Sequence, residues 1–275
     1  MIQFEYGCPG SLMETTSILR NNPEAVLLAG GTDILVRIKQ GMIQPAMLVD
    51  IKSITELHGI SSIEQNGLRI GALTTLTELV ENDLIRNRCP VLSAAALSMA
   101  CVQVRNRATI GGNVANASPA ADTVPPLMAF DAELEIFADE DIKRVPIGEF
   151  FTAPGETVLQ ENEILTAILI PDTARKAHYI KHTLREAMDI AGVGVCVSRK
   201  TQGAPDPRVV LGAVAPTPIR VPAAEQFLSE GKIEEACAAA VDAARPIDDV
   251  RASASYRKDV IYPLVKRASY AVFAR

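Results

Sequence analysis

The chain has 275 residues and a mass of 29.5 kDa, with 48% hydrophobic and 22% charged residues. Its 27 Lys and Arg residues against 33 Asp and Glu residues give a net charge of −6. These proportions exclude a mainly disordered chain and argue against a strongly basic nucleic-acid binder, while the length allows one large domain or two to three small ones.

Targeting and redox signals are weak. No apolar run reaches the ~18–20 residues that cross a bilayer, and the N-terminus from Met1 to Tyr6 lacks the basic-then-apolar pattern of a secretory signal, so we expect a soluble cytoplasmic protein. The cysteines lie 12 or more residues apart, without a C-x-x-C pair that would indicate a zinc or iron–sulfur site. We expect them to be reduced and mostly buried: Cys8, Cys89, Cys101, Cys196 and Cys237.

The N-terminal pattern predicts a helix, a strand and a second helix in sequence. A short helix ends near Arg20, turn residues follow at 21–24, and the continuously apolar run 25–29 predicts a buried strand rather than an edge strand. Gly30-Gly31-Thr32-Asp33 comes directly after it, and 34–39 has helical apolar spacing. This order is typical of one α/β unit.

The rest of the chain divides at a predicted linker, 171–175. Before it we expect strands at 47–51, 68–72, 132–137 and 163–170, and helices at 77–80 and 92–101. A second glycine-rich loop spans 105–113 and leads into small and polar residues up to Asp122. After it, sheet segments at 192–197 and 209–214 and helices at 233–244 and 256–273 predict a separate α+β unit.

The two glycine pairs are the candidate binding elements. A glycine pair between a strand and a helix lets backbone N–H groups approach an anion, yet a plain tight turn explains Gly30 and Gly31 equally well. Their spacing matches neither the Rossmann nor the P-loop pattern. The second pair, Gly111 and Gly112, lies among Thr109, Asn113, Asn116 and Ser118. Two such loops could clamp one diphosphate, although the residues alone leave the dinucleotide site and the plain turns both open.

A more specific signal comes from the combined strings LAGGTD at 28–33 and ATIGGNVANASPAAD at 108–122. Together with segments at 163–165, 181–191 and 253–257, they closely resemble the FAD-binding subunit of the molybdenum hydroxylase family, which includes xanthine dehydrogenase and carbon monoxide dehydrogenase. The resemblance implies an α+β fold: a two-lobed FAD-binding domain of the vanillyl-alcohol oxidase (PCMH) type at 1–171, with lobes of about 1–55 and 56–171, and a C-terminal α+β domain of the CO dehydrogenase flavoprotein type at 172–275.

The resemblance also implies roles for individual residues. Leu28, Ala29, Gly30, Gly31, Thr32 and Asp33 would wrap the FAD diphosphate and ribityl chain, and the loop from Thr109 through Gly111 and Gly112 to Asn113 would oppose them. Asp122 would hydrogen-bond the adenosine portion, with Ser118 supporting that turn. Leu165 would pack near the flavin or adenine, Lys181 would place a positive charge near the isoalloxazine, and Met99 and Ala100 would end a helix that approaches the cofactor.

Simpler roles compete with three of these assignments. Asp122 could cap the helix that follows it, Lys181 could be an ordinary solvated lysine, and Leu165 would be buried in any fold. His178 and His182 have a metal-binding spacing only on a helix, whereas their surroundings predict a strand, so we expect no metal site. Arg185, Glu186 and Asp189 predict a surface ion-pair cluster or a subunit interface. No nucleophile arrangement is present, which suits a flavoprotein because the ring system carries the redox chemistry.

The sequence therefore predicts the FAD-carrying subunit of a heterotrimeric molybdenum hydroxylase or dehydrogenase. The resemblance implies a small partner with two [2Fe–2S] clusters, a large partner with a molybdopterin cofactor, and an external electron acceptor such as NAD, oxygen, a quinone or a ferredoxin. Two heterotrimers could pair into a dimer. Two alternatives are a self-contained FAD-dependent oxidoreductase of the vanillyl-alcohol oxidase type and a non-catalytic nucleotide-binding scaffold. The substrate of the complex is left open, since its pocket would belong to another chain.

Overall fold

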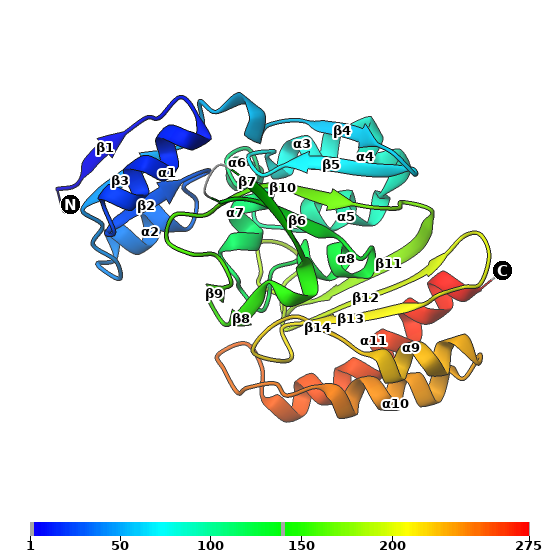
Figure 1. Ribbon diagram of the computed structural model, residues 1–275. Helices are drawn as coiled ribbons and strands as arrows, with labels where there is room; N and C mark the ends of the chain where they lie inside the picture. Colours follow the sequence, from blue (N-terminus) through cyan, green and yellow to red (C-terminus); the bar gives the residue numbers. More distant parts are fainter. Residues whose placement is uncertain (1–2, 139–140, 275) are drawn as a thin grey trace.

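The structure is a computed structural model that describes residues 3–138 and 141–274. It has three parts in chain order: a small N-terminal lobe, a central lobe and a C-terminal sheet covered by helices (Figure 1). The two-lobed N-terminal half and the C-terminal α+β unit predicted from the sequence are both present. Among the described residues, no helix combines the length and apolar character needed to cross a membrane.

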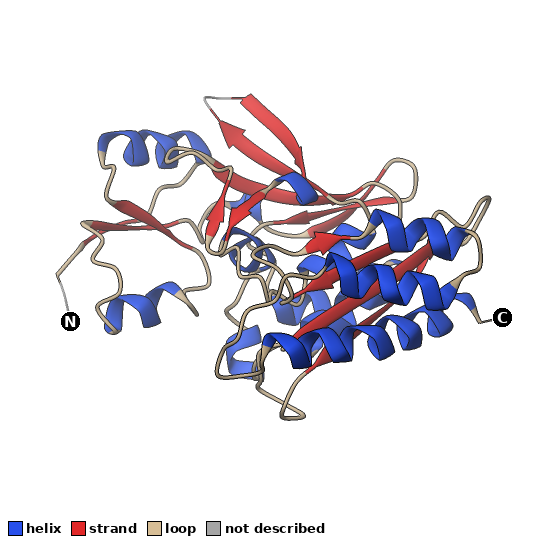
Figure 2. Cartoon of the chain, turned by 90° about the horizontal axis from the view of Figure 1, so that it is seen from below, coloured by secondary structure: helices blue, strands red, loops and turns tan. Residues whose placement is uncertain are grey.

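The N-terminal lobe is a three-stranded parallel sheet in the order β1-β3-β2, with β1 at Glu5–Gly7, β2 at Ala25–Leu28 and β3 at Met47–Asp50. Leu48 packs toward Ile38 of α2 (Ile34–Lys39), whereas Val49 belongs to the cluster of α1 (Leu12–Asn21), so the two helices cover opposite faces (Figure 2). The short 3₁₀ helix η1, Thr55–Leu57, leads out of the lobe. The prediction that 25–29 is not an edge strand is wrong, because β3 takes the central place.

The central lobe is a five-stranded, fully antiparallel sheet, in contrast to the parallel sheet of the N-terminal lobe. Its order is β4-β5-β10-β6-β7, with β4 at Ile60–Ile63, β5 at Gly67–Gly71, β6 at Glu133–Ala138, β7 at Asp141–Pro146 and β10 at Ile164–Ile170. The 3₁₀ helix η2 (Ile147–Glu149) and the hairpin of β8 (Phe151–Ala153) and β9 (Glu156–Thr157) follow β7.

Six short helices join β5 to β6 and enclose the largest core cluster: α3 (Leu76–Glu81), α4 (Asp83–Arg88), α5 (Pro90–Leu97), α6 (Val102–Arg105), α7 (Ile110–Ala115) and α8 (Val124–Ala129). Two predictions need correction here. The helix expected to run to Cys101 ends at Leu97, because the chain turns through Ala100 with φ +44°. The second glycine pair lies within α7 and not in a loop.

The C-terminal part is an antiparallel sheet of β11 (Arg175–His182), β12 (Val193–Lys200), β13 (Arg208–Gly212) and β14 (Ile219–Arg220). Along β12, Val193, Val195 and Val197 pack against α9 (Pro222–Ser229), α10 (Ile233–Ala243) and α11 (Ala254–Phe273). Cys196, which alternates with these valines, joins the core of the central lobe. The sheet is therefore a shared layer between the helices and the central lobe (Figure 1).

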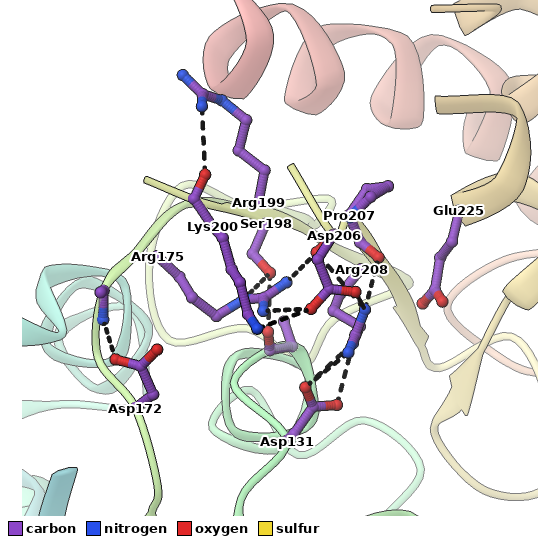
Figure 3. A network of polar contacts seen from close by, with 12 residues as sticks. Asp131, Asp172, Arg175, Ser198, Arg199, Lys200, Asp206, Pro207, Arg208 and Glu225 are labelled. Atoms are coloured by element: carbon purple, nitrogen blue, oxygen red, sulfur yellow. Dashed lines mark hydrogen bonds and ion pairs between the residues drawn. The ribbon is translucent and has the colours of Figure 1, made fainter. Parts of the chain in front are cut away.

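A charged network fixes this shared layer to the central lobe (Figure 3). Asp131, just past α8, accepts hydrogen bonds from Arg208 Nε at 3.0 and 3.1 Å and from Arg220 Nη1 at 3.3 Å. Arg208 and the buried Arg175 both pair with Asp206, Arg175 at 3.2 Å. Because the network spans segments more than 70 residues apart, it holds α8 against the C-terminal sheet.

Candidate functional site

The first glycine turn has free backbone donors. Gly30 to Asp33 connect β2 to α2, and Gly31 has φ +78°, a conformation that favours glycine. Among the hydrogen bonds of the described residues, none has the N–H of Gly30, Gly31, Thr32 or Asp33 as its donor. Leu28 and Ala29 lead into the turn as a buried and a half-buried residue, while Thr32 and Asp33 are exposed. Consecutive unpaired N–H groups at an accessible turn suit an anion such as a diphosphate.

The second glycine segment does not offer the same donors. Gly111 N donates to Ala72 O at 2.9 Å, Gly112 N to the Thr109 hydroxyl at 3.1 Å, and Asn113 N to Thr109 O at 2.9 Å. A Cβ on Gly111 would lie 2.5 Å from Ala72 Cβ, so this glycine permits α7 to pack against the chain after β5. Diphosphate binding by the first loop stays a prediction, whereas the N–H groups of Gly111, Gly112 and Asn113 already have acceptors within the protein.

The two segments nevertheless lie side by side. A Cβ on Gly30 would be 2.0 Å from the carbonyl oxygen of Arg107, which is a direct contact between backbones. The absence of a side chain at Gly30 thus lets the N-terminal lobe pack closely against the central lobe. The N–H groups of residues 30–33 consequently lie next to the second glycine segment. What the second segment can contribute is side chains.

Three of those side chains are held in place. Asn113 Oδ1 accepts the Thr123 hydroxyl at 2.6 Å, and its NH₂ group donates no hydrogen bond to another described residue. Ser118 Oγ accepts the Ala120 N–H at 3.3 Å and so supports the turn, as expected. Asp122 does not cap α8, since the N-cap of that helix is Thr123 and no side chain caps it. The alternative role for Asp122 is wrong.

Asp122 instead joins the C-terminal sheet. Its carboxylate accepts the Tyr179 hydroxyl at 2.7 Å and the Lys181 ammonium at 2.8 Å, and Lys181 also donates to Ser98 O at 3.1 Å. Burial raises the pKa of the Asp122 carboxyl, and Lys181 and Tyr179 oppose that rise. Only 10% of the Lys181 side chain is exposed, so Lys181 is not a solvated lysine.

This ion pair bears on the roles taken from the resemblance. Asp122 was assigned to the adenosine portion and Lys181 to the isoalloxazine, yet their charged groups are in contact. An extended FAD cannot place its two ends at one ion pair, so both assignments hold together only for a folded cofactor. The neighbouring turn at Met99 and Ala100 is fixed by Arg105, whose guanidinium donates to their carbonyls at 2.7 and 3.2 Å.

The remaining candidates stay apart from this group. Leu165 is buried on β10 within the central core, where its position gives no evidence for a cofactor contact. His178 and His182 lie on β11, as a strand predicts, and no group of three potential ligands in the described part of the chain could hold a metal ion. Arg185 and Asp189 form an exposed pair at 3.3 Å, within a loop where Glu186 is also exposed.

Two residues near the site were missed. Lys52, held by Asp50 at 2.6 Å, reaches Ala29 O at 3.5 Å at the carboxyl edge of the parallel sheet. Tyr179 shares a face of β11 with Lys181 because the two are separated by one residue. The strand predicted around 178–182 carried this signal for Tyr179, whereas the partner of Lys181 was not visible in the sequence.

Comparisons with known proteins agree with this geometry. Residues 2–173 match the model of the FAD binding domain in molybdopterin dehydrogenase, and residues 178–272 match the CO dehydrogenase flavoprotein C-terminal domain. The chain belongs to the FAD-binding subunits of the molybdopterin dehydrogenases. The expected family, the two-part fold, FAD as the cofactor and the oxidoreductase class are confirmed.

Relatives of this family are similar along nearly the whole chain. The putative xanthine dehydrogenase FAD-binding subunit of Escherichia coli (strain K12) is 36% identical over 273 residues, which cover 95% of this chain and 93% of the relative. The carbon monoxide dehydrogenase medium chain of Hydrogenophaga pseudoflava is 34% identical and covers 99% and 98%. A solved structure of carbon monoxide dehydrogenase from that organism superposes with a TM-score of 0.94 at 33% identity, covering 100% of this chain and 99% of that chain.

Proposed function

We propose that this FAD-binding subunit is the electron-exit component of a heterotrimeric molybdenum hydroxylase. A small partner with two [2Fe–2S] clusters would deliver electrons, and a large partner with a molybdopterin cofactor would oxidise the substrate. The whole-chain similarity to proteins named as subunits or medium chains supports this assembly. The observation that carries the role of this chain is the first glycine turn beside the second segment, where the N–H groups of residues 30–33 donate no hydrogen bond to the described part of the chain.

The chain's own residues would bind and orient the cofactor. The N–H groups of Gly30 to Asp33 suit the diphosphate, and the NH₂ of Asn113, which has no acceptor among residues 3–138 and 141–274, suits an oxygen acceptor of the cofactor. FAD, when bound, supplies the electron-accepting ring system. Lys181 does not present an isolated positive charge, because Asp122 neutralises it at 2.8 Å. In this proposal, the positive charge that the resemblance places near the isoalloxazine belongs to a buried ion pair without net charge.

The electron acceptor and the larger assembly complete the proposal. We propose NAD as the external acceptor, with oxygen, a quinone and a ferredoxin as the competing outcomes, and a cytoplasmic dimer of heterotrimers as the working assembly. The boundaries at 171 and 172 and the cofactor roles of the individual residues belong to the same proposal.

Purification of the native assembly tests this function. Absorbance spectra with acid extraction would identify FAD, metal analysis would measure iron and molybdenum, and native mass spectrometry would identify the chains. FAD with both metals and two further subunits supports the proposal, and stopped-flow mixing of the reduced complex with each acceptor then ranks the acceptors. A yellow single chain that oxidises a small substrate would favour the self-contained oxidoreductase, and a colourless chain would favour the scaffold.

A further inference from the structure

Asp122 is held from one side by two residues of a different part of the chain. Tyr179 Oη donates to Oδ1 at 2.7 Å and Lys181 Nζ donates to Oδ2 at 2.8 Å, so each carboxylate oxygen has its own donor. Only 5% of Asp122 is exposed. A carboxylate has about four acceptor positions, so Asp122 can accept a further donor besides these two from the described residues.

The sheet is shaped to allow this contact. Gly194 is paired with Lys181 across β11 and β12, and a Cβ on Gly194 would lie 3.0 Å from the Tyr179 hydroxyl. Gly212, paired with Gly194 on β13, likewise leaves room for Pro125 and for the carbonyl of Pro119. Because these two glycines, paired across β12 and β13, have no side chains, the segment that carries Asp122 can pack closely on the sheet. Ala213 N holds this segment by donating to Pro119 O at 2.7 Å.

We propose that Tyr179 is a positioning residue of the cofactor site, which together with Lys181 holds the Asp122 carboxylate in one charged orientation for a hydroxyl of FAD. This inference rests on the proposed cofactor role of Asp122. The chemistry it names is a ribityl or ribose hydroxyl, because a charged acceptor with two open positions binds O–H donors strongly. The Lys181 ammonium stabilises the negative charge of the Asp122 carboxylate, and the neutral Tyr179 hydroxyl fixes the orientation of that carboxylate.

The other titratable groups around Asp122 do not compete for this role. A titratable neighbour of Tyr179 is the thiol of Cys196, which is paired with Tyr179 across β11 and β12, and burial raises the pKa of this thiol. Burial and the nearby Asp122 also raise the pKa of Tyr179, so its hydroxyl stays protonated and donates. The carboxyl of Asp122 is the group among these whose protonation would weaken cofactor binding at acidic pH.

The test is FAD affinity as a function of pH, measured by titrating the FAD-free protein and following flavin fluorescence. Asp122→Asn is expected to weaken FAD binding about tenfold or more at pH 7.5, and Tyr179→Phe about tenfold. In Tyr179→Phe the loss of affinity at acidic pH should also begin at higher pH, because the Asp122 carboxyl loses a donor. Gly194→Ala, which crowds the Tyr179 hydroxyl without removing it, should shift the profile in the same direction by less.

Tyr256→Phe is the matched control, since Tyr256 also bonds a β11 side chain, His182 at 3.0 Å, away from Asp122. It should leave the profile unchanged. A Tyr179→Phe protein that melts at a lower temperature but keeps the wild-type pH profile would overturn the proposal, as would an Asp122→Asn protein that binds FAD normally. Failure of the wild-type protein to bind FAD at any pH would instead contradict the proposed function.

Discussion

Removal of the Lys181 ammonium should lower the stability of the folded protein, because it leaves the buried Asp122 carboxylate without its cationic partner. Lys181→Met keeps most of the side-chain volume and leaves Asp122, which is 5% exposed, with Tyr179 as its only donor among the described residues. Loss of one partner of a buried ion pair typically costs about 3–5 kcal/mol of folding free energy. We expect a loss in that range for the FAD-free protein at pH 8, where the carboxyl is ionised.

The pH dependence gives the sign of the effect. Burial already raises the pKa of Asp122 in the folded state, and without Lys181 this pKa should rise further. When the pKa of a carboxyl is higher in the folded than in the unfolded state, the free energy of unfolding of the protein falls as the pH rises between the two pKa values. The fall is about 1.4 kcal/mol for each unit that separates them. The deficit of Lys181→Met should therefore shrink as the pH falls toward 5, where wild-type Lys181 also begins to lose its charged partner.

Urea denaturation followed by circular dichroism at pH 5 and pH 8 measures this difference. Lys266→Met is the matched control, because Lys266 pairs with Glu234 at 2.6 Å while both side chains are more than a third exposed. Solvent screens an exposed pair of that kind, so we expect a small change in the free energy of unfolding. A loss below about 1 kcal/mol for Lys181→Met, equal at both pH values, would refute the reasoning.

Three further changes test other parts of the structure. Gly111→Ala should lower the melting temperature sharply because its Cβ meets the Ala72 backbone, whereas Gly148→Ala has room, and equal melting temperatures would contradict the close packing. Asp131→Ala removes the shared acceptor of Arg208 and Arg220 and should speed proteolytic cleavage between the central lobe and the C-terminal sheet. An unchanged cleavage rate would show that the charged network does not hold the two parts together. A thiol reagent should label the exposed Cys8 quickly and spare the buried Cys89, Cys196 and Cys237, which peptide mass spectrometry would check; rapid labelling of Cys89 in folded protein would show that its burial is wrong.

The sequence by itself determined the elements that depend on local pattern. Apolar periodicity located the strand at 164–170, the helices near 233–243 and 254–273, and the strand around His178 and His182 that argued against a metal site. The glycine turn at 30–33 was also readable, because a strand, a glycine pair and a helix in direct succession leave few other arrangements.

Only the tertiary structure decided what the candidate groups contact. Gly30 and Gly111 look alike in sequence, yet Gly30 begins a turn whose N–H groups donate no hydrogen bond to the described residues, and Gly111 packs α7 against Ala72. The neighbours that set this difference, Arg107 for Gly30 and Ala72 for Gly111, are 77 and 39 residues away. Asp122 and Lys181 are 59 residues apart, so no periodicity could reveal that they neutralise each other. Local spacing fixes backbone conformation, whereas long-range packing decides which donors remain free and which charges are paired.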